Sequence, residues 1–108
     1  MAITETIRYP LNTLRHVIIT HIDTGTVAAR AFVVGFKPTY VKVVNETDRI
    51  EMEWYEGMAD SEGLIRVAAG TGTLVTSNGI IPAADGFTLG LETTVYITNK
   101  QYSIQVIG

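Results

Sequence analysis

The sequence predicts an all-β domain, a single small β-sandwich or jelly-roll-like barrel, and three observations support this. Short segments rich in β-branched and aromatic residues alternate apolar with polar side chains. Turn signals separate these segments at intervals of roughly 8 to 12 residues, a spacing typical of sandwiches and barrels. No stretch of about 12 residues carries the apolar stripe of an amphipathic helix.

Length and composition favour one domain with its own core. A chain of 108 residues can bury most of its apolar surface. Hydrophobic residues make up 46% and charged residues only 18% of the chain, which excludes intrinsic disorder. The apolar share is large for so small a body. Either partner subunits cover part of that surface, or the protein is a slightly apolar monomer.

Charge excludes several classes of partner. The net charge is −3 and there is no basic run, so nothing favours nucleic acid or anionic membranes.

There are no cysteines, which excludes disulfides and favours assembly in a reducing cytoplasm. The start, MAITETIRYP, does not resemble a signal peptide. No apolar run approaches the roughly 20 residues that span a bilayer.

The strongest local signal is a β-hairpin in the middle of the chain. Residues 39–45 are rich in β-branched and aromatic side chains, and residues 50–56 alternate strictly. The polar residues 46–49 join them with the length of a hairpin turn. Asn45 and Thr47 can hydrogen-bond the local backbone, so we expect a self-capped turn at Asp48-Arg49, with a recognition contact as the alternative. We expect Ile50, Met52 and Trp54 to be buried, with Glu51, Glu53 and Tyr55 on the opposite face.

Before the hairpin, we expect an arm and two strands. Residues 1–13 are polar and interrupted by Pro10, so they form an N-terminal arm, a short edge strand or a frayed end. The β-sandwich domain spans residues 14–108. Strands are predicted at 14–22 and 27–34, separated by the turn signal at 23–26.

After the hairpin, the pattern predicts shorter strands with frequent turns. Asn78-Gly79 suits a turn with positive φ. Tyr102, Ile104 and Val106 alternate with polar residues, so the C-terminal end is expected in a sheet. The expected segments are a loop or a single helical turn at 58–63, strands at 64–69 and 73–76, a turn at 77–79, flanks at 80–82 and 87–91, and strands at 94–98 and 101–107.

The pattern shows no catalytic constellation. Glu51 and Glu53 share a strand face about 7 Å apart, but no further acid or base accompanies them, so a solvated face is the ordinary interpretation. Gly70-Thr71-Gly72 lacks the third glycine of a dinucleotide-binding turn. We therefore expect no enzyme activity and no cofactor.

Metal binding is also not expected. His16 and His21 are five positions apart, which places them on opposite faces of a strand. One of them at a subunit contact stays an alternative. Residues 60–63 offer oxygen ligands but lack the spacing of an EF-hand.

The central stretch carries a set of residues that match a known family. They are Gly35, Phe36, Pro38, Val41, Val43, Asn45, Thr47, Asp48, Arg49, Ile50, Glu53, Trp54, Tyr55, Glu56, Gly57 and Met58. Through these residues the chain resembles small virion proteins of tailed bacteriophages, a group similar to capsid decoration, or cement, proteins. The likeness is weaker at 67–71 and 86–90, and it covers about two thirds of the chain.

The resemblance implies a structural role. It implies a β-domain that binds the outside of a phage head, in contact with the major capsid protein, often as a homotrimer assembled in the host cytoplasm. It brings no active-site residue. The alternatives are a virion module that binds glycans or receptors, or another head or tail component. The candidate interface residues are Arg49, Tyr55, Asp48, Arg8 and Tyr9.

Overall fold

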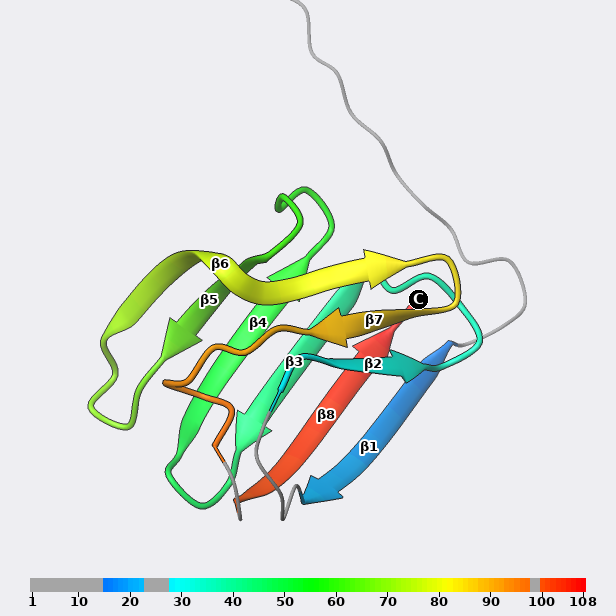
Figure 1. Ribbon diagram of the computed structural model, residues 1–108. Helices are drawn as coiled ribbons and strands as arrows, with labels where there is room; N and C mark the ends of the chain where they lie inside the picture. The colour runs from blue at the N-terminus through cyan, green and yellow to red at the C-terminus, as the bar shows by residue number, and fades with distance from the viewer. Residues whose placement is uncertain (1–14, 23–27, 98–99) are drawn as a thin grey trace, which may run out of the picture.

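The computed structural model describes residues 15–22, 28–97 and 100–108, except for the side chains of residues 21 and 22. These residues form a single antiparallel sheet of eight strands in the order β1-β8-β3-β4-β5-β6-β7-β2, and contain no helix (Figure 1). The all-β prediction is confirmed. The strands are β1 His16–Ile22, β2 Arg30–Val33, β3 Tyr40–Asn45, β4 Ile50–Tyr55, β5 Glu62–Arg66, β6 Gly72–Ala83, β7 Gly86–Leu89 and β8 Gln101–Ile107.

The sheet curls over itself because β6 belongs to both halves of it. Residues 72–75 of β6 pair with β5, and residues 80–83 pair with β7. In Figure 1, β6 crosses the molecule and carries β7 and β2 over the layer formed by β3, β4 and β8. Buried residues of both layers form one core. The result is a curled half-barrel, consistent with the predicted small barrel or sandwich.

The predicted turn at 77–79 is wrong, because β6 continues through it. Asn78 adopts a left-handed φ of 60°, as its turn propensity suggests, and the pairing register shifts between Glu62 and Gly63 of the partner strand. A side chain on Gly79 would collide with the carbonyl of Glu62, so the glycine permits close approach of the two backbones. The Asn-Gly pair bends the strand here and does not reverse it.

The core follows the alternation that the sequence predicts. On β4, Met52 is fully buried and Trp54 is 3% exposed, as expected, whereas Ile50 is half-buried. The fourteen buried apolar side chains are Phe36, Val41, Val43, Met52, Trp54, Ile65, Ile80, Phe87, Leu89, Val95, Tyr96, Tyr102, Ile104 and Val106.

The central hairpin is confirmed in its register. Residues 46–49 form the turn, Asn45 pairs with Ile50, and Tyr40 pairs with Tyr55 at the far end. Strand β8 lies on the other side of β3, so the C-terminal strand is interior to the sheet and pins that end of the chain. The strands predicted at 14–22 and 27–34 correspond to β1 and to the shorter β2.

Strand β5 begins earlier than predicted, at Glu62, so the expected loop at 58–63 is shorter. Gly63 allows this because it is buried directly against the Met52 side chain, where a Cβ would not fit. Strand β5 ends at Arg66, before the predicted limit at 69.

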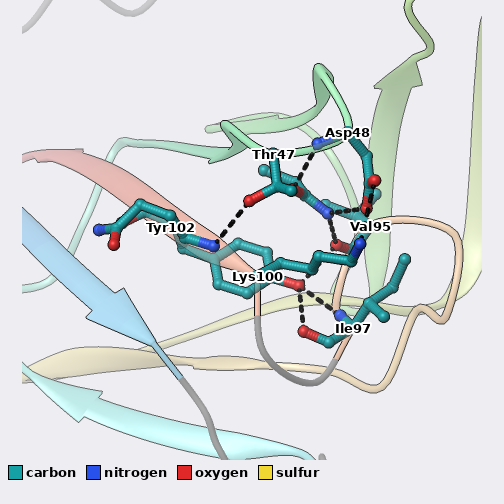
Figure 2. Close-up of polar contacts among 8 residues, drawn as sticks. Thr47, Asp48, Val95, Ile97, Lys100 and Tyr102 are labelled. Atoms are coloured by element: carbon teal, nitrogen blue, oxygen red, sulfur yellow. Dashed lines mark hydrogen bonds and ion pairs between the residues drawn. The ribbon is translucent and has the colours of Figure 1, made fainter.

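The predicted strand at 94–98 is wrong for the residues that the structure describes. The backbone N–H groups of Val95 and Tyr96 both donate to the Glu92 carbonyl, at 3.0 and 2.8 Å, which closes a turn. The hydroxyl of Tyr102 binds the backbone of this segment, as a neighbouring strand would do in a sheet. Its oxygen lies 2.9 Å from the carbonyl oxygen of Val95 and 2.8 Å from that of Ile97, and it accepts a hydrogen bond from the Ile97 N–H (Figure 2). This segment therefore satisfies its backbone groups through a side chain.

Candidate functional surface

The outer face of β3, β4 and β5 carries a salt-bridge network. The register places Lys42 opposite Glu53 and Glu51 opposite Arg66. The Glu51 carboxylate lies 2.7 Å from Arg66 Nη1 and 3.4 Å from Lys42 Nζ. The Glu51 and Glu53 side chains are 24% and 22% exposed, so they are less exposed than the sequence suggested. The side chains of Lys42 and Arg66 lie beside the two carboxylates and cover part of their surface.

Tyr40 completes the network from β3. Its phenol donates a hydrogen bond of 2.6 Å to Glu53 Oε2. Burial raises the pKa of Tyr40 well above its ordinary value, and the hydrogen bond to Glu53 and the charges of Glu53 and Glu51 act in the same direction. The phenol therefore stays protonated and serves as a fixed donor. Both glutamates are held by groups of their own sheet, which is the arrangement of a salt-bridged strand face.

Exposed apolar side chains flank this charged centre. A line of register partners runs across the outer face, with Ile18 at one end and Leu74 at the other, and Lys42 and Glu53 between them. Ile18 is 66% and Leu74 is 56% exposed. Tyr55 lies on the same face and is 47% exposed, whereas Trp54 beside it is buried. Their opposite orientation was predicted.

A shallow pocket lies beside the network, at the end of the sheet where the β3–β4 turn approaches the β5–β6 loop. Its volume is about 540 Å³. Two arginines line it, Arg49 and Arg66, together with apolar side chains such as Ile50 and Val67. Arg49 is exposed, has a left-handed φ of 58°, and makes no ion pair with a described residue. Its charge is therefore available to a partner.

The turn that presents Arg49 is held from within (Figure 2). The amide nitrogen of Asn45, which is fully buried, donates to Asp48 Oδ2 and to the Val95 carbonyl, both at 3.0 Å, and its Oδ1 accepts the Asp48 N–H. Lys100 Nζ lies 3.3 Å from Asp48 Oδ1, and Thr47 Oγ1 accepts the Gln101 N–H at 3.1 Å. The self-capped turn predicted for Asn45 is confirmed, and the cap extends to β8.

The structure separates the predicted interface residues. Arg49 and Tyr55 are exposed at opposite ends of β4, about 20 Å apart from the rise per residue. Asp48 is half-buried and already bound to Asn45 and Lys100. Arg8 and Tyr9, with the rest of the arm, lie outside the described residues.

Sequence reasoning missed Ile18, Leu74 and Val33, which are the most exposed large apolar side chains described. Their segments read as continuously apolar or small, so periodicity gave no signal for which face each side chain would occupy.

The structure also places residues that the sequence analysis considered as metal ligands. His16 is exposed at the start of β1, and the side chain of His21 lies outside the described part. Glu62 accepts the Ala59 N–H at 2.6 Å and so closes its own turn. Within residues 15–22, 28–97 and 100–108, no group of three acidic, His or Cys side chains could hold a metal ion, and no helix is long and apolar enough to cross a membrane.

Comparison with known proteins adds no relative. No protein-family model matches the chain, and neither a curated protein nor a solved structure matches it significantly.

Proposed function

We propose that this protein is a structural virion protein that binds the outside of a phage capsid and stabilises it, as a homotrimer in contact with the major capsid protein. The resemblance of residues 35–58 supports the phage origin. The outer face of the sheet supports a binding role, because its salt-bridged centre is flanked by the exposed side chains of Ile18, Leu74 and Tyr55. Aromatic, apolar and arginine side chains together are typical of protein interfaces.

The mechanism is adhesion to a repeating lattice. A trimer that engages three neighbouring capsid subunits converts the second and third contacts into intramolecular events, so modest contacts give tight attachment. A protein that binds only the assembled, expanded shell stabilises that shell by mass action. Arg49, on its internally held turn, supplies an unpaired positive charge for a carboxylate of the shell.

Addition to purified shells tests this proposal. Expanded capsids that lack the protein should take it up to a fixed stoichiometry and resist heat better, whereas unexpanded shells should not. Arg49→Ala should weaken uptake, and Lys37→Ala, which also removes an exposed cation but lies away from the pocket, should not. No uptake by any form of the shell contradicts the decoration role.

The N-terminal arm is a second contact to test. Deletion of residues 2–12 should weaken capsid attachment or trimer formation while the β-type circular-dichroism spectrum stays intact. Unchanged attachment and unchanged trimer would exclude a role for the arm.

A glycan- or receptor-binding virion module is the second candidate, and the exposed ring of Tyr55 favours it, since aromatic faces also stack on sugars. Binding to host cells or to an immobilised glycan series that Tyr55→Ala abolishes, without uptake by shells, would support this candidate over decoration.

A further inference from the structure

Among the residues that the structure describes, the sheet ends in two open edges. Strands β1 and β2 are the first and last in its order, and within the described residues each has one neighbour, β8 for β1 and β7 for β2. Strand β1, HVIITHI, is seven residues long and contains no Lys, Glu, Asp or Pro. Natural edge strands are usually protected by such residues or covered. An unprotected edge of this length indicates that another strand covers it.

The direction of the backbone hydrogen bonds shows which residues point to the open edges. The Gly108 N–H donates to the Arg15 carbonyl at 2.9 Å, and bonding alternates along an antiparallel pair, so Ile18 points its N–H and C=O away from β8. The Val34 N–H donates to the Asp85 carbonyl at 2.9 Å. By the same alternation, the backbone N–H and C=O of Val33 point away from β7.

The same two residues carry the two most exposed large apolar side chains of the described chain. Val33 is 77% and Ile18 is 66% exposed. Each open edge therefore combines free backbone donors and acceptors with an exposed apolar side chain. Those are the two components of strand addition, in which the backbone gives affinity and side chains give register.

We propose that β1 of one copy pairs with β2 of the next copy, head to tail, so that the sheet continues from subunit to subunit around a closed ring. Pairing of β1 with β1 in a two-fold dimer would leave β2 and Val33 uncovered in both copies. A heterologous contact that closes covers both edges of every copy. Strand β2 has only four residues, so each contact is short and closure of the ring adds the remaining stability.

This proposal rests on the homo-oligomer of the proposed function and names the surfaces that pair in it. A monomeric wild type contradicts both the ring and the trimer, whereas an oligomer without the edge pairing contradicts only the ring. Lack of uptake by shells contradicts only the decoration role.

Cysteine cross-linking tests the pairing, because the natural chain has no cysteine. Ile18→Cys and Val33→Cys are made separately with tags of different size and co-expressed, and the product is treated with a short bismaleimide. The proposal predicts a covalent dimer that contains both tags and almost none with two copies of one tag. Dimers of Ile18→Cys alone would indicate two-fold pairing of β1 and overturn it. No cross-link would also overturn it, as expected if residues 1–14 of the same chain cover β1.

A charge placed on each edge gives an independent test. Ile18→Lys and Val33→Lys should each convert the oligomer to smaller species by light scattering, with the β-type spectrum unchanged. Ile81→Lys is the matched control, because Ile81 is 38% exposed but lies on β6, inside the sheet, where it pairs with Thr88 of β7. Wild-type protein that is monomeric at micromolar concentration, or three variants with the same size as wild type, would contradict the proposal.

Discussion

Replacement of Trp54 by Ala tests the orientation of β4 and, with it, the whole central hairpin. The Trp54 side chain is 3% exposed, and its Nε1–H donates to the Ala59 carbonyl at 3.2 Å. Truncation removes a large ring from the core and leaves a cavity that the surrounding strands fill only in part. A loss of about 3–5 kcal/mol in the free energy of unfolding is expected.

That loss is large for a domain of this size. Small domains are stable by only about 5–15 kcal/mol in total. The entropy of unfolding is about 2.1 cal/mol/K per residue, so over 108 residues the same loss lowers Tm by about 13–22 °C. If the wild type lies near the lower end of that range, the variant keeps only about 0–2 kcal/mol, so at the larger loss about half of the molecules are unfolded at room temperature.

Urea unfolding followed by circular dichroism measures the effect, since the variant lacks the only Trp fluorophore. Tyr55→Ala is the matched control, because Tyr55 is the next residue on the opposite face, and its loss should stay near 0.5 kcal/mol. Trp54→Phe should fall between the two. Equal losses for Trp54→Ala and Tyr55→Ala would refute the assigned orientation of the strand.

Three further changes test other parts of the structure. The raised pKa of Tyr40 means that the unfolded chain loses that proton first, so stability should fall as pH rises above about 10; urea midpoints that fall equally steeply in Tyr40→Phe would contradict this. Gly79→Ala should cost roughly 1–3 kcal/mol in urea unfolding, because its Cβ would overlap a β5 carbonyl, whereas Gly72→Ala meets no close atom and should cost less. Replacement of Glu51 and Glu53 together by Gln should leave capsid uptake intact; a metal-dependent thermal shift of the wild type that a chelator removes would reveal a site at these carboxylates.

Local patterns along the chain determine which side chains of the central and C-terminal strands are buried. Strict alternation at residues 50–54 and at Tyr102, Ile104 and Val106 indicated the core face, because successive residues of a strand face opposite sides. The same rule separated buried Trp54 from exposed Tyr55. The cap of Asn45 on its own turn is a contact over three residues, so sequence reasoning reached it as well.

Of the candidate surface, the sequence supplied Arg49 and Tyr55 but not their arrangement. The polar hairpin turn placed Arg49 outside the core, and the alternation of the following strand placed Tyr55 opposite Trp54. The pocket beside Arg49, however, exists only because the β5–β6 loop returns to the end of the β3–β4 turn. The apolar edge residues Ile18 and Val33 were not found, because a run such as HVIITHI is equally compatible with a strand inside a sheet and one at its edge.

The remaining differences arise where a local signal fits two arrangements. Asn78-Gly79 favours positive φ, and both a hairpin turn and a bend within a long strand satisfy that preference. Residues 94–97 have strand propensity, but the Tyr102 phenol satisfies their backbone groups in place of a neighbouring strand. By itself the sequence determined the all-β class, the central hairpin and the faces of its strands, since these depend on contacts between near neighbours. Only the tertiary structure decided the strand order, the curl through β6 and the two open edges, because strand pairing depends on contacts between residues distant along the chain.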